Sequence, residues 1–127
     1  MSKLAKTLRR NIKWGEKELA KKNVNHREVP CVIDASAGQQ KQVTIDKVPT
    51  ITKSRGSGKN SFWETSQRRF LTVPELAKLQ GFDYKKLKFD KDVPLTAQGG
   101  MIGNAMSLPV LKFVMKRALL AAGMMKK

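Results

Sequence analysis

Apolar residues recur at helical spacing near the start of the chain. Over residues 3–22, large apolar side chains follow one another at intervals of four and seven residues, which places them on one face of a helix. The stripe consists of Leu4, Leu8, Ile12 and Leu19. Gly15 interrupts the segment and is expected to weaken the helix by about 1 kcal/mol relative to alanine. The pattern predicts an amphipathic helix that docks by this stripe.

Two short apolar runs follow, at residues 29–33 and 43–45, with a polar turn between them. They predict two β-strands joined by that turn, and residues 49–52 predict a third short extended segment. Residues 53–60 are small, basic and rich in glycine and serine, which predicts a flexible loop. Such a loop lets the backbone approach phosphates closely, although a plain linker fits the same composition. It lacks the pattern of a nucleotide P-loop.

A capping box marks the start of a short helix over residues 73–80. Thr72 and Glu75 stand at the N-cap and N3 positions, and Pro74 lies in the first turn, where its missing N–H does no harm. Gly81 supplies the C-terminal stop. The side chains expected to face a core are Leu76, Ala77 and Leu79.

The last third of the chain predicts one long apolar helix after a poorly patterned stretch. Residues 83–97 are polar and irregular, and residues 98–105 are rich in glycine and predict a turn. Ser107 is a good N-cap for a helix that should run to about Ala122. A helix with so many apolar positions must pack against something large, and this chain offers few strands for it.

Charge narrows the classes of function. The 127 residues include 26 Lys and Arg against 10 Asp and Glu, a net charge of +16. Eight basic and two acidic residues fall within residues 1–23, and six basic residues and one acidic residue fall within residues 47–69. Nucleic acid is the usual partner for such an excess, with an anionic membrane surface as the second option.

The remaining composition excludes several kinds of site. One Cys and one His exclude a disulfide framework, a Cys-rich zinc site and a His-based metal cage, so we expect no metal site. No apolar run reaches 18 residues, so no membrane span is expected. We expect an intracellular, reducing compartment. A transit peptide to an organelle is an alternative, because residues 1–15 are basic and free of acids.

Two linked motifs resemble those of the DNA (cytosine-5) methyltransferases. Residues 69–82 look like the family's ninth motif, Arg-x-Leu-x-x-x-Glu followed by a Gly-aromatic pair. Residues 103–110 look like its tenth motif, which opens the last helix, and residues 50–55 look like the threonine-containing core of a target-recognition domain. The resemblance covers roughly residues 27–123. It identifies the chain as the C-terminal part of such an enzyme.

The resemblance implies specific residue roles. It places Gly103, Asn104 and Ala105 at an S-adenosylmethionine pocket shared with a partner catalytic half, where exposed amides would favour the cofactor's carboxylate; a plain helix-capping turn is the alternative for them. Arg69 and Glu75 would organise the recognition domain against the catalytic one, while a simple helix cap explains Glu75 equally well. The residues expected to contact DNA are Thr50, Thr52, Lys53, Ser54, Arg55 and Lys59.

Several family features are missing. The cofactor-binding Phe-x-Gly-x-Gly, the Glu-Asn-Val segment and the Arg-x-Arg are absent from the sequence. Pro30-Cys31 is similar to the catalytic Pro-Cys pair, but Val32 follows it and its position is wrong, so a buried strand cysteine is the better interpretation. We therefore expect no catalytic residue here and no activity from this chain alone.

These observations combine into one predicted architecture. We expect an α+β fold in which a small irregular β region is flanked by a basic N-terminal helix and two C-terminal helices, together completing a larger α/β methyltransferase fold. The expected divisions are a basic helix over 1–26, a partial target-recognition region over 27–68 and a C-terminal helical segment over 69–127.

Two functions remain open at this point. The first is the DNA-binding, C-terminal portion of a cytosine-5 methyltransferase, in the nucleus or another DNA-containing compartment. This portion could be a subunit of a split enzyme that works with a catalytic subunit, a truncated gene product or a retained remnant. The alternative is a basic structural protein of a ribonucleoprotein or chromatin particle, derived from such a methyltransferase fragment. It would bind RNA or DNA through the helix at 3–22, the 53–59 loop and the two final lysines. A membrane-surface helix at the N-terminus is a third, weaker option.

Overall fold

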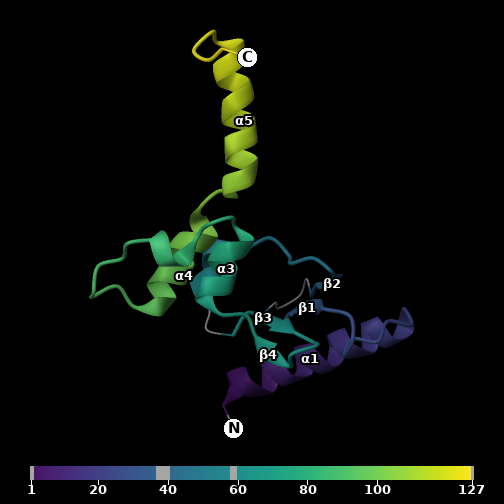
Figure 1. Ribbon diagram of the computed structural model, residues 1–127. Coiled ribbons are helices and arrows are strands. Elements are labelled where there is room, and N and C mark those ends of the chain that lie inside the picture. Colours follow the sequence, from purple (N-terminus) through teal and green to yellow (C-terminus); the bar gives the residue numbers. More distant parts are fainter. Residues whose placement is uncertain (1, 37–40, 58–59, 127) are drawn as a thin grey trace.

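The computed structural model describes residues 2–36, 41–57 and 60–126. It is an α+β structure, as expected, with a four-stranded antiparallel sheet between helical layers and a last helix that projects from the body (Figure 1). The helices are α1 (Lys3–Lys21), α2 (Lys53–Ser57), α3 (Val73–Leu79), the 3-10 turn η1 (Tyr84–Lys86), α4 (Leu95–Asn104) and α5 (Leu108–Ala121). The strands are β1 (Cys31–Asp34), β2 (Val43–Ile45), β3 (Phe62–Glu64) and β4 (Arg69–Phe70).

The sheet has the strand order β2-β1-β3-β4, and β1 is its buried centre. The predicted pairing of the first two strands is confirmed, with Cys31 opposite Ile45. The sequence pattern did not predict β3 and β4, because strands of three and two residues are too short to show alternation. Trp63 and Phe70 pair across them with ring centroids 5.0 Å apart. The residues at 49–52 contribute no strand.

Helix α1 covers one face of the sheet. Its buried positions are Leu8, Asn11, Gly15 and Leu19. Gly15 is a point of close approach, since a Cβ there would lie 2.6 Å from the Ile33 side chain. The predicted stripe is therefore partly wrong: Leu4, one turn before the first of these contacts, is 67% exposed.

Helices α3 and α4 cover the opposite face. Successive strand residues point to opposite sides, so Ile33 meets α1 while Val32 joins the core beneath α3 and α4. That core contains Val32, Phe62, Leu76, Ala77 and Ile102. The predicted capping box at Thr72 and Glu75 is present. Leu79, expected in the core, is 49% exposed instead.

Two glycine-rich segments that were predicted as a loop and a turn are helices. Residues 53–57 form α2, and residues 98–104 lie within α4. A Cβ at Gly56 or Gly99 would overlap the backbone of the other residue, and a Cβ at Gly103 would overlap the Thr52 carbonyl. The glycines therefore serve close helix packing, and this packing offsets their low helix propensity.

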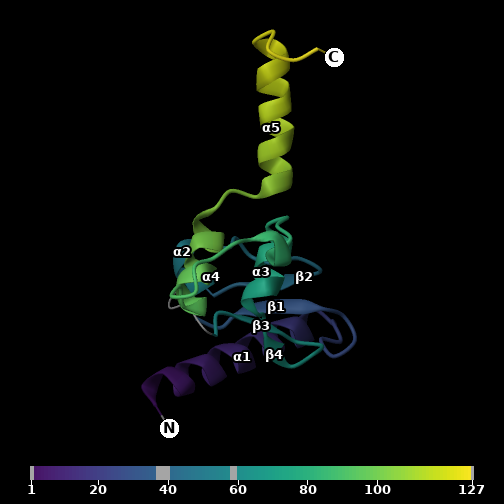
Figure 2. The ribbon, with the colours of Figure 1, turned by 60° about the vertical axis from the view of Figure 1, so that its left-hand side comes forward.

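Helix α5 forms where predicted, with a proline in its first turn, but only its start touches the described body of the chain. The Leu108 N–H donates to the Gln80 carbonyl at 2.8 Å, and Pro109 lies against Gly81. None of its described residues is buried, and it points away from the sheet and from α1 (Figure 2). Ser107 occupies the N-cap without a side-chain capping bond. No helix among the described residues is long and apolar enough to cross a membrane.

Candidate nucleic-acid interface

The junction of α2 and α4 brings two predicted site segments together. The Thr52 carbonyl lies directly against Gly103, so the threonine-containing segment over residues 50–55 is in contact with the tenth-motif segment. The Thr52 hydroxyl accepts from the Arg55 N–H at 3.4 Å and lies 3.1 Å from the Ser54 hydroxyl. Thr52, Lys53 and Ser54 are all exposed, so this end of α2 presents two hydroxyls and one cation to solvent.

Arg55 joins this segment to the central strand. Its Nε donates to Asp34 Oδ2 at 2.8 Å, and the Ser36 hydroxyl donates to the other carboxylate oxygen at 3.0 Å. The Asp34 side chain is only 7% exposed. A buried carboxylate without a cation is costly, so Arg55 has a structural task in holding α2 against β1.

Thr50 and Ala105 line one small cavity. Its volume is about 400 Å³, and it lies between residues 48–51 and the link from α4 to α5. Thr50 is exposed at its edge. Lys59, the last of the predicted DNA contacts, lies outside the described residues.

The tenth-motif segment has a different setting from the one expected. Gly103 is buried, Asn104 is exposed, and the Ala105 carbonyl accepts from Gln80 Nε2 at 3.2 Å. Asn104 ends α4, and α5 begins only at Leu108. The C-terminal end of a helix presents free carbonyls and not free amides. The Ala105 N–H is already bonded to the Met101 carbonyl at 3.0 Å, and Asn104 is the exposed side chain of the three. Their role at a cofactor pocket stays a prediction.

Arg69 and Glu75 form a two-pronged ion pair between β4 and α3. The guanidinium donates to the Glu75 carboxylate at 2.9 Å through Nη1 and at 2.5 Å through Nη2. The same carboxylate accepts from the Thr72 N–H at 2.8 Å. Hydrogen bonds from Arg69 first, and from Thr72 next, lower the pKa of Glu75 to about 2. The pair fixes the start of α3 on the sheet.

Cys31 has the surroundings of a structural cysteine. It is fully buried on β1, on the face of the sheet that α1 covers. Burial raises the pKa of its thiol, although a hydrogen bond with Thr65 acts in the opposite direction. A raised pKa and no access to solvent make it a poor nucleophile, in agreement with the predicted buried strand cysteine.

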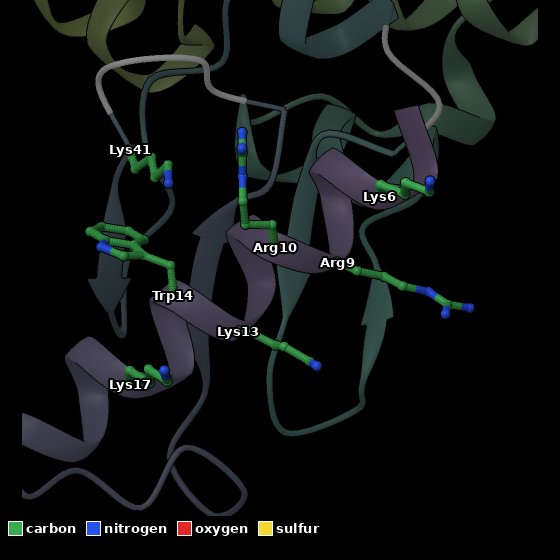
Figure 3. Close-up of a pocket in the computed structure, with 7 residues that line it drawn as sticks. All are labelled: Lys6, Arg9, Arg10, Lys13, Trp14, Lys17 and Lys41. Atoms are coloured by element: carbon green, nitrogen blue, oxygen red, sulfur yellow. The ribbon is translucent and has the colours of Figure 1, made fainter. Parts of the chain in front are cut away.

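A basic groove lies on α1, the helix that the alternative function predicted to bind RNA or DNA, although none of its residues was named as a site. It has a volume of about 540 Å³ and is drawn in Figure 3. Its lining residues are Lys6, Arg9, Arg10, Lys13, Trp14, Lys17 and Lys41. The spacing of positions 6, 10, 13 and 17 puts their side chains on one helix face, and this signal was available in the sequence. The described residues hold no group of three or more His, Cys, Asp or Glu side chains that could bind a metal ion.

Comparison with known proteins gives one match. A family model described as C-5 cytosine-specific DNA methylase matches residues 2–119. No curated protein and no solved structure matches the chain. The matched range begins at residue 2 and therefore includes α1, which the resemblance over 27–123 had left out.

Proposed function

The chain belongs to the C-5 cytosine-specific DNA methylase family, and from this premise we propose that it is the DNA-binding, C-terminal portion of a cytosine-5 methyltransferase. A partner chain would carry the catalytic half, and this chain would be inactive alone. The observation that carries the proposal is the α2–α4 junction, where the Thr52 backbone is packed on Gly103. That contact places the predicted DNA-contacting segment directly beside the predicted cofactor segment.

The burial of Cys31 supports a catalytic nucleophile on a partner chain. Cytosine C5 methylation requires a thiolate that attacks the flipped-out base. The one cysteine of this sequence is buried between a strand and a helix, where a flipped base has no access. The nucleophile is therefore assigned to the partner.

Helix α5 supplies a surface for that partner. Val110, Phe113 and Val114 are 56, 59 and 52% exposed. Exposed apolar side chains gathered on one helix are typical of a protein interface. In the proposal α5 packs into the catalytic half. Asn104, four residues before the start of α5, would then lie near the interface and could offer its side-chain amide to S-adenosylmethionine, the methyl donor of this family. The complex would act in the nucleus or in a DNA-containing organelle.

The test is reconstitution of methyl transfer. The chain is co-expressed with catalytic halves of cytosine-5 methyltransferases, and transfer of labelled methyl groups to cytosine in DNA is measured. We expect activity only from the pair. Val114→Glu should abolish complex formation, whereas Lys116→Gln, which lowers the net charge by the same amount on the same helix, should leave it intact. Failure with every catalytic half, together with a monomeric chain on size exclusion, would overturn the proposal.

The basic groove on α1 favours a second candidate function, a structural protein that binds RNA or DNA without a cofactor. Six of its seven lining residues are basic. The two candidates differ in their response to S-adenosylmethionine. A saturable thermal shift with S-adenosylmethionine that Asn104→Ala abolishes supports the methyltransferase portion. The absence of a shift, with tight RNA binding that falls steeply with salt, supports the structural protein.

A further inference from the structure

The outer face of α1 carries a regular row of cations. Lys6, Arg10, Lys13 and Lys17 follow at intervals of four, three and four residues, opposite the buried positions that dock the helix on β1. From the first to the last the row is about 16 Å long. This length equals the axial rise of about four or five phosphates along one strand of a duplex. The row is thus long enough for several phosphates at once.

The surroundings of this row contain little negative charge. No acidic residue lines the groove in the described ranges, and Glu18 on the same helix is paired with Lys21 at 2.8 Å. Arg9 adds a fifth cation from α1, and Lys41 adds a sixth from the segment before β2. Each phosphate contact made here would release counterions, which is the main source of affinity for nucleic acid.

One aromatic side chain lies within the cations. Trp14 lines the groove, and the Lys41 ammonium lies 5.5 Å from the centre of its ring (Figure 3). A cationic groove with an aromatic ring in it is the arrangement that holds single strands, because the groove follows the phosphates while a base stacks on the ring. The bases of a duplex are already stacked on one another and are not available to the indole.

We propose that the α1 groove binds single-stranded nucleic acid, with phosphates on the lysines and arginines and one base stacked on Trp14. The site lies on the opposite face of the sheet from the core beneath α3 and α4, and none of the residues predicted to contact DNA lines it. The inference rests on the same groove as the second candidate function and names the kind of nucleic acid that the groove would bind, but it does not depend on methyl transfer or on a catalytic partner. Its test uses the chain alone, so its failure is separate from failure of the methyltransferase proposal.

The test measures binding of fluorescein-labelled oligo(dT) by anisotropy over a range of salt concentrations. The groove variant combines Lys6→Gln, Lys13→Gln and Lys17→Gln. The control variant combines Lys85→Gln, Lys88→Gln and Lys91→Gln, which are exposed and remove the same charge far from the groove along the chain. We expect the groove variant to weaken binding at least tenfold and to lower the salt slope by about 2, at roughly 0.7 per phosphate contact. The control should change affinity less than about twofold.

Replacement of the indole tests the stacking. Trp14→Leu should weaken binding at least about fivefold, whereas Trp14→Phe, which keeps an aromatic ring, should recover most of the affinity. Thermal melting of each variant shows whether it is folded. Equal losses in the groove and control variants would overturn the proposal in favour of net charge alone. A duplex that binds as tightly as oligo(dT), with no effect of Trp14→Leu, would overturn the single-strand assignment.

Discussion

At the scale of single residues, Glu75 joins two interactions whose strength depends on its charge. It caps α3 through the Thr72 amide and pairs with Arg69 on β4. Because these contacts lower the pKa of its carboxyl from 4.5 to about 2, the stabilisation they give is complete above about pH 4.5. It is lost as the pH falls from there towards 2, where the carboxylate becomes protonated.

We therefore predict that Glu75→Gln lowers the melting temperature at neutral pH by roughly 3–6 °C, the effect of losing one good cap. The difference between wild type and variant should shrink as the pH falls from 4.5 to 2. Thermal melts monitored by circular dichroism over this range are the measurement. Glu28→Gln, at an exposed glutamate, removes the same charge and is the matched control. A wild-type-to-Glu75→Gln difference that is constant from pH 7 to pH 2 would contradict the assignment.

Cys31 gives a second prediction at this scale. Its thiol is buried and its pKa is raised, first by that burial, so reaction with a thiol reagent requires the strand to open. We expect labelling by a maleimide to be at least about a hundredfold slower in the native chain than in urea. A cysteine introduced at the exposed Ala20 should react at once. Rapid labelling of Cys31 in the native chain would contradict this burial and would make Cys31 a candidate nucleophile.

At the scale of elements, the packing of α2 on α4 depends on glycines. A Cβ at Gly103 would overlap the Thr52 carbonyl, which is backbone and cannot move aside as a side chain can. A Cβ at Gly100, on the same helix, would lie 3.3 Å from the Ser57 Cβ and 3.9 Å from atoms of Lys53, which is close to ordinary contact. Both substitutions to alanine gain helix propensity, so the difference between them reports the packing alone.

We predict that Gly103→Ala lowers the free energy of unfolding by about 1–3 kcal/mol, the usual cost of overpacking. Gly100→Ala should be close to neutral, since its gain in propensity offsets a small adjustment at Ser57. Urea denaturation of the three proteins is the measurement. Two variants of equal stability would show that α2 does not rest on α4 in solution.

At the scale of the whole molecule, the sequence predicted those helices and strands that form through interactions between residues close together along the chain. Helices α1, α3 and α5 and the β1–β2 pair follow from periodicity, caps and apolar runs. The sequence did not predict helices α2 and α4 because glycine has a low helix propensity. Its advantage here is the close approach of the two helices, which exists only in the folded chain. At the candidate site, Arg69 and Glu75 lie six residues apart and were predicted together. Arg55 and Asp34 lie 21 residues apart, and only the folded sheet reveals their pairing.

The projection of α5 from the body leads to a last prediction. An isolated helix of 14 residues is marginal in water, and α5 has no buried residue among those described. Helix α1 has 19 residues and docks on the sheet through Leu8 and Leu19, so it is the internal reference for a packed helix. Hydrogen exchange should therefore show α5 amides exchanging at least about tenfold faster than those of α1, with a catalytic partner removing the difference. Equal protection of α1 and α5 in the free chain would mean that another molecule already packs on α5. A second copy of this chain would then be the first partner to test, by measuring the oligomeric state.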